Sequence, residues 1–400
     1  MSFCKITQKK LKPFMSFGKM PLANGFLLKK DFNNEFFYNL EASFSEDISL
    51  FQINDHPKPK QMFNKHYPFF TSSSKFMINH FKKYSHWVKK KFLNSNSKLI
   101  EIGSNDGTFL GNFKNSNIEY IGFEPSFNVF KKAEQGNINT LNDFFSTKSI
   151  DKINNFKKKT DVIVGSNVVC HIPNLVDFIK TVDILLSSNG TLIFEEPYLG
   201  SMYKKVSYDQ IYDEHIFLFS ITSVYKIFKR FDFDLIDAIP QVTHGGSMRY
   251  ILKRKKNKNN LNKIKKFIEN EKKFKINSID GCIDFKKNCE QSKNDLIEKL
   301  YKIKKSNKII CGYGATSKST TILNYCKING ELIDCIFDAT KEKIGKYSPG
   351  MHIPINDSKF FNKKFYDYVY LFAWNHKKEI LNKEKNYSDK GGRWISHVKL

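Results

Sequence analysis

The stretch Lys98-Leu-Ile-Glu-Ile-Gly-Ser-Asn-Asp-Gly-Thr-Phe-Leu110 decides the fold of this 400-residue chain. Its apolar start, residues 98–102, is typical of a buried strand, and the strand runs into Gly103. Glycine takes backbone angles closed to other residues and lets a ligand approach the main chain. Asp106 and Gly107 then open what we expect to be a helix. We therefore predict a ligand-binding parallel α/β domain that begins near Lys98.

Outward from this stretch, short β-rich runs alternate with amphipathic runs. The pattern predicts strands at 98–102, 120–123, 161–164 and 191–195, helices at 127–132 and 175–186, and candidate additional strands at 231–239 and 248–252. This order is typical of a doubly wound parallel sheet.

A second α/β unit is predicted from residue 306 onward. A strand at 309–312 runs into Gly-Tyr-Gly-Ala-Thr-Ser-Lys318, a helix follows through Tyr325, and strands are expected at 332–337 and 368–372. The Lys- and Asn-rich stretch 253–275 keeps helical spacing of its apolar residues, which favours a solvated linker helix over a nucleic-acid-binding arm. We predict an irregular N-terminal module at 1–60, an α/β domain at 61–252, a helical linker at 253–305 and a Rossmann-like domain at 306–400.

The loop after the first strand indicates which ligand is bound. A dinucleotide site would show GxGxxG around a pyrophosphate, whereas here Gly103 and Gly107 enclose an acidic segment. Such a loop suits the cationic groups of S-adenosylmethionine. Glu124 ends the next strand about twenty residues on, where a carboxylate can accept both ribose hydroxyls. The expected cofactor-binding residues are Glu101, Gly103, Asn105, Asp106, Gly107, Glu124 and Asn167.

Composition narrows the class of protein. The net charge of +26 comes almost entirely from Lys spread through the chain, and no recognition motif accompanies it, so we expect no nucleic-acid binding. A positive field would instead attract an anionic small substrate. No stretch approaches the roughly 18 apolar residues of a membrane span, and the N-terminus lacks a secretory signal, so the cytoplasm is the expected location. The seven cysteines lack CxxC spacing and are expected to be reduced thiols.

Several further segments resemble the nucleotide-sugar C-methyltransferases, which add a methyl branch to a keto-deoxysugar held on a nucleoside diphosphate. In chain order they are Met20-Pro-Leu-Ala-Asn-Gly25, Tyr67-Pro-Phe-Phe-Thr-Ser-Ser-Ser74, the cofactor loop, Ser166-Asn-Val-Val-Cys-His-Ile-Pro173, Glu195-Glu-Pro-Tyr198, Tyr208-Asp-Gln-Ile-Tyr-Asp-Glu-His215, His244-Gly-Gly-Ser-Met-Arg249, Gly312-Tyr-Gly-Ala315, Pro349-Gly-Met-His-Ile-Pro354 and Ala373-Trp-Asn375. The resemblance implies a class I S-adenosylmethionine-dependent methyltransferase domain at the centre, followed by a C-terminal Rossmann-like domain.

The N-terminal module departs from this family. Its members usually open with a small zinc module that carries paired cysteines, whereas only Cys4 remains here. A structural zinc site needs four thiolate or imidazole ligands, and Cys4, His56 and His66 are too few and too irregularly spaced. We therefore expect a zinc-free module and no metal site.

Methylation of carbon requires a base for the proton next to a ketone and donors for the enolate oxygen. By resemblance, His215 is the expected base, and Glu214 and Tyr212 position the substrate or stabilise the enolate. An imidazole titrates near neutrality, which suits a base that must shed its proton between turnovers. Tyr67 is a further hydroxyl candidate, with packing at a domain junction as the alternative.

The remaining polar residues of the shared segments are candidates for binding the substrate. Two glycines beside Arg249 could converge on an anionic ligand, and the turn before Lys318 could take a diphosphate or be only a tight strand-to-helix turn. The expected substrate-binding residues are Glu196, His244, Ser247, Arg249, Gly312, Gly314 and Lys318.

Two rival functions remain open at this stage. One is an O- or N-methyltransferase of a related glycan precursor, which needs no acidified carbon. The other is a non-catalytic protein that binds S-adenosylmethionine and serves in assembly. Whether the new methyl group is on carbon, oxygen or nitrogen distinguishes a C-methyltransferase from the first rival. A measurement of cofactor binding bears on the second rival. The sequence carries no signal of the oligomeric state.

Overall fold

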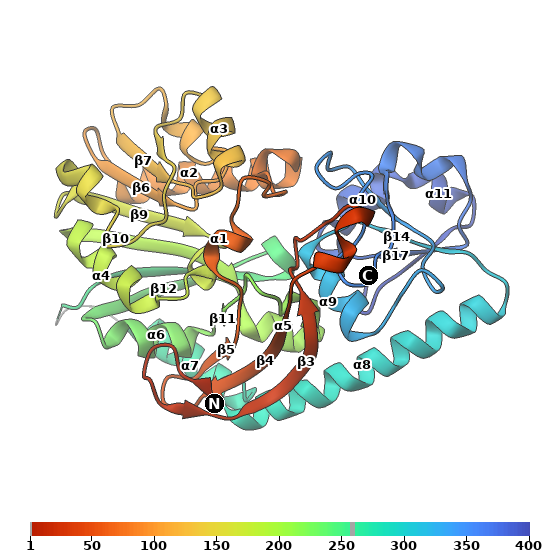
Figure 1. Cartoon of the computed structure of the whole chain (residues 1–400). Helices are drawn as coiled ribbons and strands as arrows, with labels where there is room; N and C mark the ends of the chain where they lie inside the picture. Colours follow the sequence, from red (N-terminus) through yellow and green to blue (C-terminus); the bar gives the residue numbers. More distant parts are fainter. Residues whose placement is uncertain (1, 257–260) are drawn as a thin grey trace.

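The computed structural model describes residues 2–256 and 261–400. Residues 257–260, part of the expected linker, lie outside the described residues. Two α/β lobes flank an N-terminal module that lies between them, and a long helix runs beneath both (Figure 1).

The larger lobe is built on a seven-stranded sheet with the order β12-β13-β10-β9-β6-β7-β8. Its strands are β6 (Lys98–Ile102), β7 (Glu119–Phe123), β8 (Thr140–Leu141), β9 (Thr160–Ser166), β10 (Leu186–Pro197), β12 (Phe233–Gln241) and β13 (Ser247–Arg254). All neighbours are parallel except for the two pairs that involve β13. The order reverses between β6 and β9, and ligands of such sheets bind at the carboxyl ends of the strands at this point.

Two apolar cores cover the faces of this sheet. One face packs with residues of α2 (Lys75–Phe92), where Phe81, Tyr84 and Val88 are buried. The other face packs with α4 (Leu175–Leu185) and α6 (Ile221–Lys229) and belongs to a core that continues into the N-terminal module and the C-terminal lobe. The remaining helices of this lobe are α3 (Phe127–Gln135) and α5 (Leu199–Lys205).

The N-terminal module is more regular than its sequence suggested. After the short pair β1 (Ser2–Phe3) and β2 (Lys10–Leu11), an antiparallel sheet has the order β11-β5-β4-β3, with β3 (Pro13–Pro21), β4 (Phe37–Ser45), β5 (Leu50–Ile53) and β11 (Phe217–Leu218). The edge strand β11 follows directly on the YDQIYDEH segment. This pairing fixes the YDQIYDEH segment against the N-terminal module.

The C-terminal lobe is a five-stranded parallel sheet with the order β16-β15-β14-β17-β18. Its elements are β14 (Ile310–Tyr313), α9 (Ser317–Tyr325), β15 (Ile336–Asp338), β16 (Ile355–Asp357), β17 (Tyr368–Leu371), α10 (Lys377–Lys383), α11 (Lys385–Asp389) and β18 (Arg393–Ile395). The lobe is reached through α7 (Asn262–Lys273) and α8 (Ile279–Lys305), the long helix at the bottom of Figure 1. The Rossmann-like arrangement predicted for this region is confirmed.

Two predicted elements differ in the structure. After Gly107 the chain forms only a short 3-10 turn, Leu110–Phe113, instead of a helix. The segment that follows is rich in Gly and Asn, which are poor helix formers. The strand expected at 332–337 is formed only from Ile336 to Asp338, because residues 329–333 close a hydrogen-bonded turn.

Candidate active site

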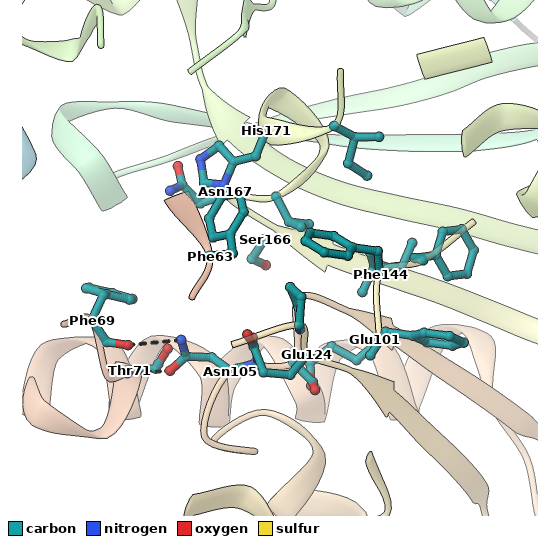
Figure 2. Close-up of a pocket in the computed structure, with 18 of the residues that line it drawn as sticks. Phe63, Phe69, Thr71, Glu101, Asn105, Glu124, Phe144, Ser166, Asn167 and His171 are labelled. Carbon is teal, nitrogen blue, oxygen red and sulfur yellow. Dashed lines mark hydrogen bonds between the residues drawn. The ribbon is translucent and has the colours of Figure 1, made fainter. Parts of the chain in front are cut away.

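A cavity of about 420 Å³ lies at the carboxyl ends of β6, β7, β9 and β10. Its wall includes Glu101, Gly103, Asn105, Glu124 and Asn167, which the sequence predicts as cofactor-binding residues. Figure 2 shows several of these side chains on opposite walls of the pocket. The cavity has the size of a small-molecule site.

Glycine is required at two positions of the cofactor loop. Gly103 has φ +62°, and a Cβ there would lie 2.7 Å from Val168 Cγ2. Gly107 has φ +79°, and its Cβ would lie 2.6 Å from Ile138 Cγ1. Gly103 lines the cavity, whereas close packing against Ile138 accounts for Gly107.

Two carboxyl groups at the ends of β6 and β7 face the cavity. Glu101 is buried, its Oε2 has no hydrogen-bond partner, and burial raises its pKa well above the usual value. Burial also raises the pKa of Glu124 to about 7, although its oxygens accept backbone N–H bonds from Asn105 and Ser126 at 3.1 and 2.7 Å. An unpaired buried carboxyl group beside a cavity suits a cationic ligand group.

Asn105 and Asp106 of the cofactor loop direct their hydrogen bonds away from the cavity. Asn105 and Asp106 make their side-chain hydrogen bonds to the segment at 69–72 and, for Asp106, also to Thr108. Asn105 still lines the cavity.

Asn167 and Glu196 lie at the carboxyl ends of two neighbouring strands. Asn167 directly follows β9, and Glu196 is the second-last residue of β10. Asn167 has φ +55°, and its Oδ1 is buried without a partner. Glu196 Oε1 accepts the backbone N–H groups of Val168 and Val169 at 3.0 and 2.7 Å, and burial raises the Glu196 pKa to about 7. Glu196 therefore shapes the loop that presents Asn167.

His215 is held as a neutral base. Its Nδ1 lies 2.7 Å from the carbonyl oxygen of Gln210, which can only accept, so Nδ1 carries the proton. The lone pair of Nε2 faces the Tyr212 hydroxyl at 2.8 Å. Burial, with His171 nearby, lowers the pKa of His215 well below its usual value. The imidazole is thus unprotonated at neutral pH.

Glu214 lies at a junction of three segments. Its carboxylate accepts hydrogen bonds from the Tyr67 hydroxyl at 3.1 Å and from Asn24 Nδ2 at 2.6 Å. Burial and the neighbouring Asp213 raise the pKa of Glu214. Asp213 in turn accepts the backbone N–H of Ala23 at 3.1 Å. The Met20–Gly25 segment of the N-terminal module therefore positions the YDQIYDEH segment.

A column of stacked rings connects the cavity with His215. The rings of Phe63 and His171 are stacked with their centroids 5.6 Å apart. The rings of His171 and His215 are stacked with their centroids 5.4 Å apart. Phe63 and His171 line the cavity, and His171 Nε2 is buried without a partner. His171 therefore lies between the cofactor pocket and the base.

The HGGSMR segment is divided between packing and the cavity. A Cβ on Gly245 would lie 2.1 Å from Trp374 Cη2, so this glycine allows the contact between the two lobes. Arg249 donates to Glu195 at 2.6 Å, and its guanidinium lies 3.9 Å from the centre of the Tyr84 ring. Its charge is therefore engaged within the larger lobe. His244 and Ser247 line the cavity.

In the C-terminal lobe, packing also accounts for the glycines in and directly after β14. A Cβ on Gly312 would lie 2.6 Å from Phe372 Cε2, and one on Gly314 would lie 2.6 Å from Ala373 Cβ. The backbone N–H of Ala315 donates to Asp338 at 2.7 Å. This arrangement matches the tight strand-to-helix turn, the alternative to a diphosphate-binding loop.

Lys318 is buried where the C-terminal lobe meets the YDQIYDEH segment, with Asp209 and Lys205 nearby. It is 7% exposed, and no carboxylate oxygen of the described residues lies within 4.0 Å of its Nζ. It donates to Asn375 at 3.4 Å and lies 4.5 Å from the centre of the Trp374 ring. Burial lowers the pKa of Lys318 to about 8, while Asp209 opposes this shift. His244 lies near Lys318. Burial is the larger cause that lowers the pKa of His244, and the charge of Lys318 is the second.

Comparison with known proteins agrees with this geometry. Family models match almost the whole chain in three pieces: "Putative zinc binding domain" at 4–63, "Methyltransferase domain" at 77–238 and "C-methyltransferase C-terminal domain" at 242–398. The C-methyltransferase NovU of Streptomyces niveus is 26% identical over 384 residues, which cover 95% of this chain and 91% of NovU. The chain is an S-adenosylmethionine-dependent methyltransferase with a C-terminal domain of the C-methyltransferase type.

Two solved structures show weaker likenesses to this methyltransferase. An S-adenosylmethionine-dependent methyltransferase from Clostridium acetobutylicum is 12% identical, with 46% of this chain and 94% of that chain covered and a TM-score of 0.35. The magnesium protoporphyrin IX methyltransferase of Synechocystis is 13% identical, with 44% and 79% covered and a TM-score of 0.34.

The residues present fit S-adenosylmethionine. The Gly103 cradle, the unpartnered carboxyl oxygen of Glu101 and the Glu124 carboxyl at the end of the second strand provide a close backbone approach and two acidic contacts. The predicted cofactor is thereby confirmed at the level of the family and the fold.

The N-terminal module does not fit zinc in the same way. Cys4 is the one cysteine of the stretch matched as a zinc binding domain, and its Sγ lies 3.4 Å from the backbone nitrogen of Thr7. The buried Gln52 side chain instead joins the first turn to β5, accepting from Lys5 N at 3.0 Å and donating to the Phe3 carbonyl at 2.9 Å. A side-chain amide thus closes this turn.

Among the described residues, the one group with close metal-binding atoms is Cys170, His171 and His215, within 4.8 Å of one another. His215 already uses one nitrogen on Gln210 and the other on Tyr212. Both bonds favour a role in proton transfer. Among all the residues that the structure describes, no helix is both long and apolar enough to cross a membrane.

Several pocket residues were missed by the sequence analysis. They are Phe63, Phe69, Thr71, Phe144, Ser166 and His171, all labelled in Figure 2. The aromatic pair after the third parallel strand, Phe144 and Phe145, was a usable signal, because a flat cofactor base needs an apolar wall. The sequence at 67–74 indicated a family resemblance and Tyr67 as a hydroxyl candidate, but it did not indicate the cofactor pocket, because that position depends on the segment folding back over the sheet.

Proposed function

We propose that the enzyme methylates a carbon next to the ketone of a nucleoside-diphosphate-linked keto-deoxysugar through an enolate. The observation that carries this proposal is the pairing of a neutral imidazole with a carboxyl group of raised pKa in one segment, at His215 and Glu214. Two groups whose pKa values are shifted in this way are typical of an acid and base pair.

In this mechanism His215 Nε2 accepts the proton from the carbon next to the ketone. The hydrogen bond from Nδ1–H to Gln210 keeps the imidazole in the required tautomer. The Tyr212 hydroxyl lies 2.8 Å from the same nitrogen, so the substrate must displace this hydrogen bond to reach Nε2. The electrons of the broken C–H bond pass to the carbonyl oxygen and form the enolate.

Glu214 and Tyr67 stabilise the oxygen of the enolate. Because its pKa is raised, Glu214 retains a proton near neutral pH and can donate it as a hydrogen bond. The Tyr67 hydroxyl donates to Glu214 at 3.1 Å and acts on the enolate oxygen by orienting this carboxyl group. S-adenosylmethionine, which Glu101, Gly103 and Glu124 would hold, would supply an electrophilic methyl group to the enolate carbon, with cleavage of its S–CH₃ bond and release of S-adenosylhomocysteine.

The buried Lys318 supports a diphosphate-linked substrate. Lys318 is a buried cation without an ion-pair partner at 4.0 Å among the described residues, and Lys205 lies close enough to lower its pKa further. An unpaired buried cation is costly unless a ligand supplies the counter-charge. We place the diphosphate between Lys318 and His244, at the junction of the lobes.

The test is methyl transfer from labelled S-adenosylmethionine to a panel of nucleoside-diphosphate keto-sugars and to the same sugars reduced at the carbonyl. We expect label only in the keto-sugars, with the new methyl group on carbon by NMR. Lys318→Met should raise KM for the nucleotide sugar about tenfold or more, since a charged hydrogen bond is lost, with little change in cofactor affinity. Label on oxygen or nitrogen would instead support the rival O- or N-methyltransferase.

A further inference from the structure

The cofactor loop contacts a segment that closes over the pocket. We call residues 57–74 the strap; it joins β5 to α2 and contains α1 (Pro59–Met62). Six strap residues line the cavity: Pro59, Lys60, Phe63, Tyr67, Phe69 and Thr71. The strap forms one wall of the cofactor pocket, as Figure 2 shows for Phe63, Phe69 and Thr71.

Two side chains of the cofactor loop hold the strap by its backbone. Asn105 Oδ1 accepts the N–H of Thr71 at 2.8 Å, and Asn105 Nδ2 donates to the Phe69 carbonyl at 3.2 Å, as the dashed lines in Figure 2 mark. Asp106 Oδ2 accepts the N–H of Ser72 at 2.8 Å, and its Oδ1 accepts the Thr108 hydroxyl at 2.6 Å. Both oxygens of Asp106 are thereby engaged, and Asp106 is not among the described residues that line the cavity.

The same strap delivers Tyr67 to the substrate site. Tyr67 is buried, its carbonyl accepts from Asn128 at 2.8 Å, and its hydroxyl donates to Glu214 at 3.1 Å. The contacts made by Asn105 and Asp106 lie two to five residues further along the chain. A shift of the strap at these contacts would therefore move the Tyr67 hydroxyl away from Glu214.

We propose that Asn105 and Asp106 are positioning residues, which hold the strap and through it set Tyr67 against Glu214. Asp106 acts on the reaction through the strap and makes no direct contact with the cofactor. The part of this inference that concerns catalysis rests on the proposed role of Glu214. Any ligand that packs against Phe63 and Phe69 stabilises the held strap, so cofactor binding favours the arrangement that places Tyr67.

The first test compares Asp106→Ala, Asp106→Asn, Asn105→Gly and the control Asn112→Ala. Glycine at 105 tolerates the left-handed backbone, where φ is +49°. The side-chain amide of Asn112 donates hydrogen bonds to the carbonyls of Thr108 and Phe109, which lie in its own turn. We expect faster amide hydrogen exchange across residues 63–70 in Asp106→Ala and Asn105→Gly, and wild-type exchange in Asn112→Ala. Asp106→Asn keeps an acceptor and should restore protection.

The second test separates the strap from the cofactor. In Asp106→Ala the Kd for S-adenosylmethionine should change by less than about fivefold, because a nearby charge and one contact to the strap are lost while the two Asn105 contacts still hold the strap. The kcat should fall about tenfold, the weight of a hydrogen bond to a charged group. Combined with Tyr67→Phe, the loss should stay within about twofold of the larger single loss, since both variants disable the same contact.

Three results would overturn the inference. They are an increase of tenfold or more in the cofactor Kd with unchanged exchange over 63–70, kcat losses that multiply in the double variant, or failure of Asp106→Asn to restore protection. The exchange and affinity measurements need no methyl acceptor. They therefore decide the role of Asp106 even where no nucleotide sugar is methylated.

Discussion

At the scale of single residues, the site depends on groups whose charge is set by burial. His215 is kept neutral and its tautomer is fixed by the carbonyl of Gln210. Glu214 and Glu196 carry raised pKa values because they lie away from water. For His215 and Glu196, we make predictions that a single substitution can test.

If His215 removes the proton next to the ketone, exchange and methylation should fail together. With a keto-sugar, heavy water and a non-reactive cofactor analogue, the wild-type enzyme should wash deuterium into the carbon to be methylated. His215→Asn should lower both rates by about 10²- to 10⁴-fold, the contribution of a well-placed base. Calorimetry should show unchanged cofactor affinity. Near wild-type methylation by the variant would make His215 structural.

Glu196 should make stability depend on pH. Its pKa is about 7 in the folded protein against 4.5 for an unperturbed carboxyl group, so the folded state binds more protons between these values. Stability from this group is therefore full below pH 4.5 and is lost as the pH rises to 7. Relative to Glu196→Gln, the wild-type free energy of unfolding should fall by about 3 kcal/mol over this interval. Urea titrations at several pH values measure it; a constant difference would show that Glu196 is ionised throughout.

At the scale of elements, the N-terminal module remains useful to the enzyme without the paired cysteines of its relatives. Its β5 strand pairs with β11, next to the YDQIYDEH segment, and Asn24 bonds to Glu214. The side chain of Gln52 closes the first turn by two hydrogen bonds. The module thus positions the YDQIYDEH segment through ordinary sheet and side-chain contacts.

This arrangement predicts a module that needs no metal. Elemental analysis of the purified enzyme should find no stoichiometric zinc, and its circular dichroism and melting temperature should be unchanged in chelator. Gln52→Ala should lower the free energy of unfolding by about 1 to 3 kcal/mol, because buried partners are left unpaired. One tightly held zinc ion per chain would contradict the prediction.

At the scale of the whole molecule, one apolar core joins all three parts of the chain. It runs from Cys4 in the N-terminal module to Ile395 in the last strand. Polar contacts reinforce it: Trp374 donates to Asp209 at 2.6 Å, and Thr320 donates to the Ala23 carbonyl at 2.8 Å. A shared core of this kind links the lobes more tightly than the usual polar interface between domains.

We therefore expect the lobes to unfold together. In Trp87→Phe, the remaining tryptophans belong to the C-terminal lobe, Trp394 in β18 and Trp374 at the contact with the larger lobe. Their fluorescence and the far-ultraviolet circular dichroism of the whole chain should give one coincident denaturant transition. Two separated transitions would show that the lobes are independent.

The sequence by itself determined most strands and helices of the two α/β lobes. Strands ending in glycine turns, their order along the chain and the acidic residue after the second strand are local patterns, and local propensity decides them. The same patterns predicted the cavity position of Gly103, Glu101 and Glu124, because the carboxyl ends of parallel strands meet at one edge.

Only the tertiary structure decided what the polar side chains of these motifs contact. Asp106 and Arg249 looked like ligand-binding groups, yet they bond to Ser72 and Glu195. Gly245 looked like part of an anion-binding loop, and it makes room for Trp374. Each partner lies tens of residues or more away in the chain, so its position depends on how the lobes and the strap pack, and no pattern of spacing within a motif contains that information.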